Sequence, residues 1–197
     1  MEIDRSKISP MMKQYLDTKD DYPDTILFFR VGDFYEMFFD DALLVSKTLE
    51  LTLTGKECGL EERAPMCGVP HHSSEIYVKK LIEAGYKVAI CEQLTDPSEG
   101  KGIVQRDVIR VVTPGTLIES SMLSDDNNNY ICCAYYDNQS CGMCFADIST
   151  GEVRLALVDG GKNLEPELVD LLSRYSPAEV IFLSLIHISE PTRPLYI

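Results

Sequence analysis

The sequence contains no apolar run that approaches the ~20 residues needed to span a bilayer, and its first residues lack the apolar core of a signal peptide. We therefore expect a cytoplasmic protein with no membrane partner. Seven cysteines, an odd number without regular spacing, favour reduced thiols over a disulfide framework. No G-x-x-x-x-G-K-[ST] loop occurs, so this chain alone has no P-loop ATPase, and no nucleophile-elbow motif supports a Ser-His-Asp triad.

Basic residues are also scarce. The 18 lysines and arginines stand against 32 aspartates and glutamates, a net charge of −14. This balance argues against non-specific nucleic-acid binding, which depends on cations that neutralise phosphates. Between Pro97 and Gly115 the local balance is slightly positive, so a local site is not excluded. We take Lys101, Arg106 and Arg110 as candidate contacts to a DNA backbone, with a solvated surface position as the alternative.

The sequence predicts neither a metal site nor catalytic residues. Cys141 and Cys144 lie three apart in a predicted strand, so their thiols point to opposite faces of a sheet. Asp147 lies near where active nucleases of the ribonuclease-H-like fold place a metal-binding carboxylate. Those enzymes need several acidic side chains that point to one place to hold two metals, and the sequence shows no such set of acidic residues around Asp147. We interpret Asp147 as structural and keep a nuclease that uses it as an alternative.

Strands alternate with helices over residues 1–118, which predicts a mixed α/β domain. Polar turn-forming residues at 119–128 predict a linker. Residues 129–183 then follow the order of three antiparallel strands, a helix and a strand, which opens a ribonuclease-H-like fold. In the first domain we expect strands at 25–31, 50–54, 86–91 and 108–113, helices at 11–16, 34–48 and 76–84, and a charged loop at 55–70.

The C-terminal residues 184–197 begin where that fold should continue with a helix and a strand. This segment resembles the in-frame translation of a sequencing adapter, and we expect a tail that is no part of the natural fold. A natural divergent tail is the alternative.

The stretch Gly32–Phe39 predicts the start of an amphipathic helix. Asp33 is a good N-cap and Glu36 follows three residues later, which resembles a capping box. Tyr35, Phe38 and the apolar residues that follow recur at helical spacing and would face a core. Phe34 is left at the edge of the apolar stripe.

Four segments in series resemble the N-terminal part of the MutS family of bacterial DNA mismatch-repair proteins, and the similarity covers residues 7–182. They are Phe28–Phe38, Ala64–His72, Val88–Gln93 and Val111–Thr116. The resemblance implies a mismatch-recognition domain at 1–118 and part of a ribonuclease-H-like connector at 129–183. Core, clamp and ATPase domains follow in the family, so we expect a truncated, non-catalytic member without a cofactor. ATP and magnesium would belong to the missing ATPase domain.

The resemblance also implies partners and roles. The partners would be mismatched double-stranded DNA, a second copy in a homodimer, and a MutL-family protein at the connector. Phe34 would stack against the mispaired base as a wedge, and Glu36 would hydrogen-bond that base. Positions i and i+2 diverge by about 200° on a helix. Both side chains reach one base only if the helix begins at Asp33 or Phe34, with Phe34 exposed and Phe38 buried. A structural or interaction fragment that does not bind DNA is the remaining alternative.

Overall fold

The computed structural model describes residues 5, 7–95, 104–117, 128–137, 140–159 and 164–184. The chain divides into two compact units, Met1–Thr113 and Pro114–Ile197. Both are mixed α/β, as the sequence predicts. Lys101 lies outside the described residues, as do the predicted linker except Asn128 and the predicted tail except Ser184. Among the described helices, none is both long and apolar enough to cross a membrane.

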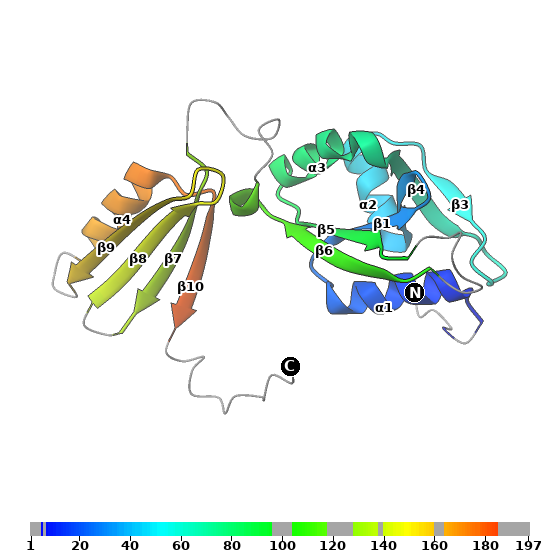
Figure 1. The fold of residues 1–197 in the computed structure, drawn as a ribbon, viewed down its shortest axis with the longest axis horizontal. Coiled ribbons are helices and arrows are strands. Elements are labelled where there is room, and N and C mark those ends of the chain that lie inside the picture. Colours follow the sequence, from blue (N-terminus) through cyan, green and yellow to red (C-terminus); the bar gives the residue numbers. More distant parts are fainter. Residues whose placement is uncertain are drawn as a thin grey trace. The chain divides into compact units, whose positions relative to one another are not determined.

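The first unit is a mixed sheet with helices on both faces (Figure 1). Its strands have the spatial order β3-β4-β2-β1-β5-β6, in which only β1 and β5 are parallel. The strands are β1 (Ile26–Val31), β2 (Phe34–Phe38), β3 (Thr54–Lys56), β4 (Ala64–Pro70), β5 (Val88–Gln93) and β6 (Arg106–Val112). The helices are α1 (Pro10–Asp21), α2 (Phe39–Leu49) and α3 (Ser74–Glu83). Helix α1 lies on one face of the sheet, and α2 and α3 lie on the other.

The prediction that a helix begins at Asp33 or Phe34 is wrong. Gly32 and Asp33 form a two-residue hairpin loop that joins β1 to β2, because Val31 pairs with Phe34. Gly32 has φ +58°, a conformation that glycine adopts without the cost of a Cβ. Helix α2 begins only at Phe39. Pairing of β2 with both β1 and β4 stabilises the extended chain more than the helical spacing of its aromatic residues stabilises a helix.

Two further expectations for this unit are wrong. The predicted strand at 50–54 is instead the C-cap of α2, where Glu50 takes a left-handed conformation (φ 55°), and irregular chain that ends where β3 begins at Thr54. Part of the predicted loop at 55–70 is strand β4. The two prolines of β4 are compatible with a strand, because Pro70 is its last residue and Pro65 lies opposite the short strand β3, positions where a missing N–H is tolerated.

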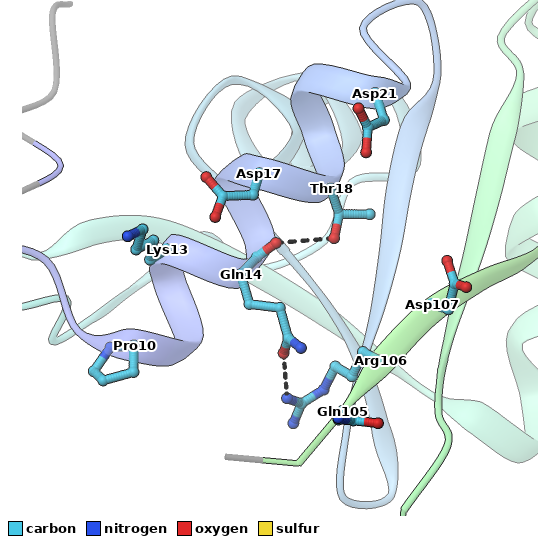
Figure 2. Close-up of a pocket in the computed structure, with 9 residues that line it drawn as sticks. All are labelled: Pro10, Lys13, Gln14, Asp17, Thr18, Asp21, Gln105, Arg106 and Asp107. Atoms are coloured by element: carbon cyan, nitrogen blue, oxygen red, sulfur yellow. Dashed lines mark hydrogen bonds between the residues drawn. The ribbon is translucent and has the colours of Figure 1, made fainter. Parts of the chain in front are cut away.

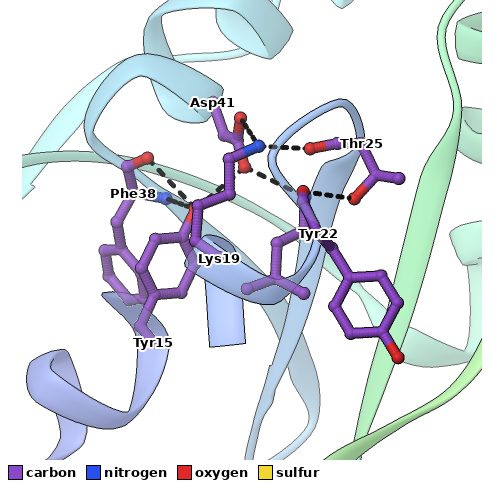
Figure 3. Close-up of polar contacts among 7 residues, drawn as sticks. Tyr15, Lys19, Tyr22, Thr25, Phe38 and Asp41 are labelled. Atoms are coloured by element: carbon purple, nitrogen blue, oxygen red, sulfur yellow. Dashed lines mark hydrogen bonds and ion pairs between the residues drawn. The ribbon is translucent and has the colours of Figure 1, made fainter. Parts of the chain in front are cut away.

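A buried polar network joins α1 to α2 (Figure 3). Asp41 accepts hydrogen bonds from the Tyr15 hydroxyl (3.1 Å) and the Leu27 backbone N–H (3.0 Å), and forms an ion pair with Lys19 (2.9 Å). The Tyr15 ring packs edge-on against Phe38, with the ring centroids 4.9 Å apart. Burial, and then the neighbouring Asp41 charge, raise the pKa of Tyr15, so its hydroxyl stays protonated and serves as the donor.

The second unit has the element order that the sequence predicts. Strands β7 (Tyr130–Tyr136), β8 (Ser140–Asp147) and β9 (Glu152–Asp159) form an antiparallel meander, and β10 (Glu179–Ser184) pairs parallel to β7. Helix α4 (Leu164–Tyr175) covers one face of this sheet. A short 3₁₀ helix, Pro114–Thr116, precedes the sheet, and the Pro114 carbonyl oxygen accepts a hydrogen bond from the Asn129 side chain (2.9 Å).

Candidate nucleic-acid interface

Phe34 and Glu36 lie on the same face of β2. Side chains two residues apart in a strand share a face, so the divergence expected on a helix does not arise. In the ladder, Phe34 pairs with Val31 and Glu36 pairs with Phe29. Helix α1 covers this face over Phe29, which is fully buried, whereas Phe34 remains 46% exposed. Phe38 is fully buried, so the predicted contrast between the two phenylalanines is confirmed.

The Glu36 carboxylate forms an ion pair with Lys56 of β3, which reaches it across β4. The Glu36 side chain is 15% exposed and that of Lys56 is 29% exposed. Between them, Gly68 of β4 pairs with Glu36. A Cβ at Gly68 would lie 3.2 Å from the Tyr35 carbonyl oxygen, which is tighter than an ordinary contact, so glycine lets the backbone of β4 pack closely against β2 beside Glu36.

The opposite face of the hairpin is fixed by Tyr35. Its ring is buried beside Phe28, and its hydroxyl hydrogen-bonds to the Glu92 carboxylate. Arg30 lies over the ring, with Cζ 5.6 Å from the centroid, and its Nη1 is 3.8 Å from Glu92 Oε1. Burial, followed by the hydrogen bond to Glu92, raises the pKa of Tyr35. The hairpin is therefore anchored on its covered side while Phe34 stays exposed on the other.

The loop between the two strands is held as well. The His71 backbone N–H donates to the Asp33 carbonyl oxygen at 2.9 Å, and Phe34 pairs with Pro70 at the end of β4. The backbone that carries Phe34 is thus tied to two strands and to the 3₁₀ helix His71–Ser73.

Arg106 lies on the Phe34 face, but its guanidinium is engaged within the protein. Its Nε donates to the Arg30 carbonyl oxygen (2.7 Å), and its Nη1 donates to Gln14 Oε1 (2.9 Å) and to the Val104 carbonyl oxygen (3.1 Å). Its Cζ is 4.8 Å from the centroid of the Phe29 ring. Burial lowers the pKa of Arg106. A phosphate contact would have to use the remaining nitrogen, Nη2.

Beside Arg106, a groove runs between α1 and the start of β6 (Figure 2). Figure 2 shows the Arg106 side chain directed toward Gln14 at this groove. Three aspartates line it, Asp17, Asp21 and Asp107, against two cations, Lys13 and Arg106. A net negative lining disfavours phosphate, so the groove itself is not a backbone-binding site.

Arg110, another predicted contact to the DNA backbone, pairs with Ile90 of β5. Glu36 pairs with Phe29, and Phe29 pairs with Cys91, the residue of β5 next to Ile90. Arg110 therefore lies on the opposite face of the sheet from Glu36. The structure brings Phe34, Glu36 and Arg106 to one face and leaves Arg110 on the other.

No pattern in the sequence pointed to Lys56 as part of this site. Lys56 reaches Glu36 only because β3 and β2 both pair with β4, and the sequence-based interpretation placed all of β4 in a loop. The hairpin itself had a signal, because a Gly-Asp pair between two apolar runs is typical of a two-residue hairpin loop.

Asp147 closes the turn between β8 and β9. Its carboxylate accepts hydrogen bonds from the backbone N–H groups of Asn129 (3.1 Å), Ser149 (2.9 Å) and Thr150 (3.3 Å), and from the Ser149 hydroxyl (2.6 Å). Burial by itself raises the pKa of Asp147, but these donors outweigh it and the pKa is lowered. Within the described ranges, no group of three or more His, Cys, Asp or Glu side chains is placed to hold a metal ion.

Replacing Asp147 by asparagine should lower the free energy of unfolding at pH 7 by about 1–3 kcal/mol, since the turn loses a charged acceptor. The folded-state pKa lies below 3.8, so the contribution of the carboxylate is present above pH 3.8 and is lost as pH falls through the folded-state pKa. Urea unfolding of the chain and the variant from pH 7 to pH 3 should show the difference shrinking in acid. Asp159→Asn, at an exposed position on β9, is the control. A difference that stayed constant with pH would contradict the assignment.

Comparison with known proteins gives two family matches. The model for MutS domain I matches residues 9–121, and that for MutS domain II matches residues 129–190. Curated relatives are each called DNA mismatch repair protein MutS. That of Clostridioides difficile (strain 630) is 53% identical over 185 residues, which is 94% of this chain and 19% of the relative. That of Alkaliphilus oremlandii (strain OhILAs) is 53% identical over 176 residues, 89% of this chain and 20% of the relative. The chain thus spans about a fifth of the length of the curated relatives it matches.

Proposed function

This chain belongs to the MutS family, and we propose that its first unit recognises mispaired bases in double-stranded DNA through Phe34 and Glu36, as part of DNA mismatch repair in the cytoplasm. The observation that carries the proposal is the face of β2, on which an exposed phenylalanine and a carboxylate point the same way from one rigid hairpin. An exposed aromatic ring can stack on the face of a nucleobase, because every base presents a π-face.

Phe34 acts as the wedge. Apolar side chains inserted between base steps unstack them and kink the duplex, at a cost of a few kcal/mol per step. A mispair has already lost part of its pairing and stacking, so insertion costs less there than in matched DNA. Because this selection depends on deformability rather than on base identity, one phenylalanine can serve several different mispairs.

Glu36 supplies the polar contact. A carboxylate is an acceptor only, so it takes a hydrogen bond from a base N–H group. Its own charge is unfavourable near phosphates, and the ion pair with Lys56 offsets that charge. We propose that Lys56 is the residue that lets a carboxylate approach DNA, and that Arg106, which lies on the same face, adds to the positive field.

The other partners are proposals for the whole protein. We propose a homodimer, a MutL-family partner bound at the second unit, and an ATPase domain outside this chain that binds ATP and magnesium. The support is the extent of the match, since the curated relatives are about five times longer than this chain.

The proposal is tested by a chimera in which residues 1–117 replace the equivalent segment of the C. difficile relative. Binding to a G·T-mismatched duplex and to its matched counterpart is measured by fluorescence anisotropy across a salt series, since affinities without the salt concentration cannot be interpreted. We expect the chimera to prefer the mismatched duplex. Equal affinity for both duplexes, in a chimera that folds, would reject the proposal.

Substituting methionine for Lys56 should weaken binding of the chimera to matched and mismatched duplexes alike by about 1 kcal/mol, roughly fivefold, because Glu36 then meets the phosphates without its cation. The double variant Glu36→Gln with Lys56→Met removes that repulsion and should recover the lost affinity for matched DNA. If the double variant is as weak as the single one, Lys56 contacts DNA itself and does not act through Glu36.

A further inference from the structure

A pair of cysteines faces outward from the second unit. Cys133 of β7 and Cys144 of β8 are direct partners in the antiparallel ladder, so both point to the same side of the sheet. That side is opposite α4, whose contacts are with the alternate residues of these strands, among them Cys132 and Cys141. Cys133 is exposed and Cys144 is partly exposed, and both are free thiols.

The two thiols are close enough to bond. Directly opposed residues of an antiparallel pair have Cα atoms about 4.5–5.5 Å apart. Disulfides occur at Cα separations of about 4.4–6.8 Å. Neither strand therefore has to move along or away from the other for a bond to form between the sulfur atoms of Cys133 and Cys144.

The surroundings leave both thiols accessible. In the next strands of the sheet, Ile181 lies beside Cys133 and is 49% exposed, and Leu155 lies beside Cys144 and is 80% exposed. A Cβ built on Gly142, two residues before Cys144 on the same side, meets no described atom within 4 Å. Among the described residues, nothing covers this face of the sheet near the pair.

The two cysteines on the α4 side, Cys132 and Cys141, are buried. Burial raises the pKa of Cys132 to about 11 and also raises the pKa of Cys141. Because the thiolate is the nucleophile, these two side chains remain unreactive thiols near neutral pH. The second unit therefore separates its four cysteines into a buried, inert pair and an outward-facing pair.

We propose that Cys133 and Cys144 form a redox-responsive dithiol, which small-molecule disulfides such as oxidised glutathione convert to a cross-strand disulfide. The Cys133 thiolate attacks one sulfur of oxidised glutathione, forms a mixed disulfide and releases one glutathione thiolate. The Cys144 thiolate then attacks the Cys133 sulfur, forms the cross-strand bond and releases the second. The two protein thiols are oxidised, one glutathione disulfide is reduced, and the two protons pass to the glutathione thiolates or to solvent.

The reaction is reversible by the same route. An exposed disulfide is open to attack by an external thiol, and disulfides of intracellular proteins are usually transient for this reason. The oxidation state of the Cys133–Cys144 pair would thus follow the ratio of oxidised to reduced glutathione in the surrounding solution. This inference does not depend on the proposed DNA-binding role of the first unit.

The test uses the full 197-residue chain. The reduced chain is incubated with oxidised glutathione, remaining thiols are blocked with N-ethylmaleimide, and the products of chymotryptic digestion are analysed by mass spectrometry. Cleavage after Tyr135 or Tyr136 separates the peptide that contains Cys133 from the one that contains Cys144. We expect these peptides to remain linked, and dithiothreitol to release them.

Variants locate the bond. Cys133→Ser and Cys144→Ser should each abolish the linked peptides and leave a glutathione adduct on the remaining outward cysteine, whereas Cys132→Ser should retain the link. Three outcomes overturn the proposal: a stable glutathione adduct on Cys133 of the wild-type chain, a link that persists in Cys133→Ser, or no modification of either cysteine. A disulfide between two chains, seen on a non-reducing gel, overturns it as well.

Discussion

Replacing Phe34 by alanine is expected to remove the preference of the chimera for mismatched over matched DNA, while its affinity for matched duplex changes little. Stacking of a base on an aromatic side chain contributes about 1–3 kcal/mol by alanine substitution, so the ratio of the two affinities should fall by roughly 5–150-fold. Matched DNA is affected less because it resists the unstacking that brings the ring between bases. The measurement is the ratio of dissociation constants for the G·T-mismatched and matched duplexes at fixed salt.

Ile76→Ala is the control, because Ile76 is 61% exposed on α3, on the opposite side of the first unit's sheet. It removes a similar exposed apolar side chain without touching the hairpin, and should leave the ratio unchanged. Thermal unfolding of both variants checks that they fold. A folded Phe34→Ala variant that kept the full mismatch preference would show that the wedge is not Phe34.

The second large effect concerns stability. Asp41→Ala is expected to destabilise the first unit by about 3–5 kcal/mol, since it removes the carboxylate that pairs with the largely buried Lys19 and leaves the Leu27 N–H without its side-chain acceptor. That cost is a large fraction of the about 5–15 kcal/mol by which a native domain is stable. Urea unfolding followed by circular dichroism measures it as a shift of the transition that belongs to the first unit.

Asp40 provides a matched control, because it is the same residue type in the same first turn of α2 but is exposed. Asp40→Ala loses only a favourable interaction with the helix N-terminus, about 0.3–1 kcal/mol. Tyr15→Phe should fall between the two, at about 1 kcal/mol, because it removes one donor from the network. Equal losses for Asp40→Ala and Asp41→Ala would mean that the network in Figure 3 contributes nothing beyond the helix dipole.

The second unit could be predicted almost completely from the sequence. Its strands are rich in β-forming residues between turn signals, and its helix repeats apolar residues at helical spacing, so the local pattern and the final structure agree. The first unit could not be predicted as well, because local and non-local signals conflict at β2. Asp33 and Glu36 have the spacing of a helix cap, yet the pairing of β2 with β4, some thirty residues later, decides its conformation.

The candidate site likewise contains residues that the sequence could identify and residues that it could not. Phe34 and Glu36 were predicted from a resemblance of short motifs, and their placement on one face follows from a strand that local pattern missed. Lys56 could not be found, since its contact with Glu36 requires the positions of three strands. The engagement of Arg106 with Gln14, 92 residues earlier, is equally invisible to local pattern. Residue spacing in the sequence identifies side chains that could bind DNA, but the pairing of the strands determines which of these side chains contact one another.

The position of β2 within its sheet has a mechanical consequence. Because β2 is hydrogen-bonded on both sides, by β1 and by β4, the peptide groups that carry Phe34 and Glu36 have little room to yield under load. When a stiff body presses on a softer one, nearly all of the deformation occurs in the softer one. If the hairpin meets a duplex as proposed, most of the strain would fall on the base stack, and the free energy of binding would depend mainly on the compliance of the DNA.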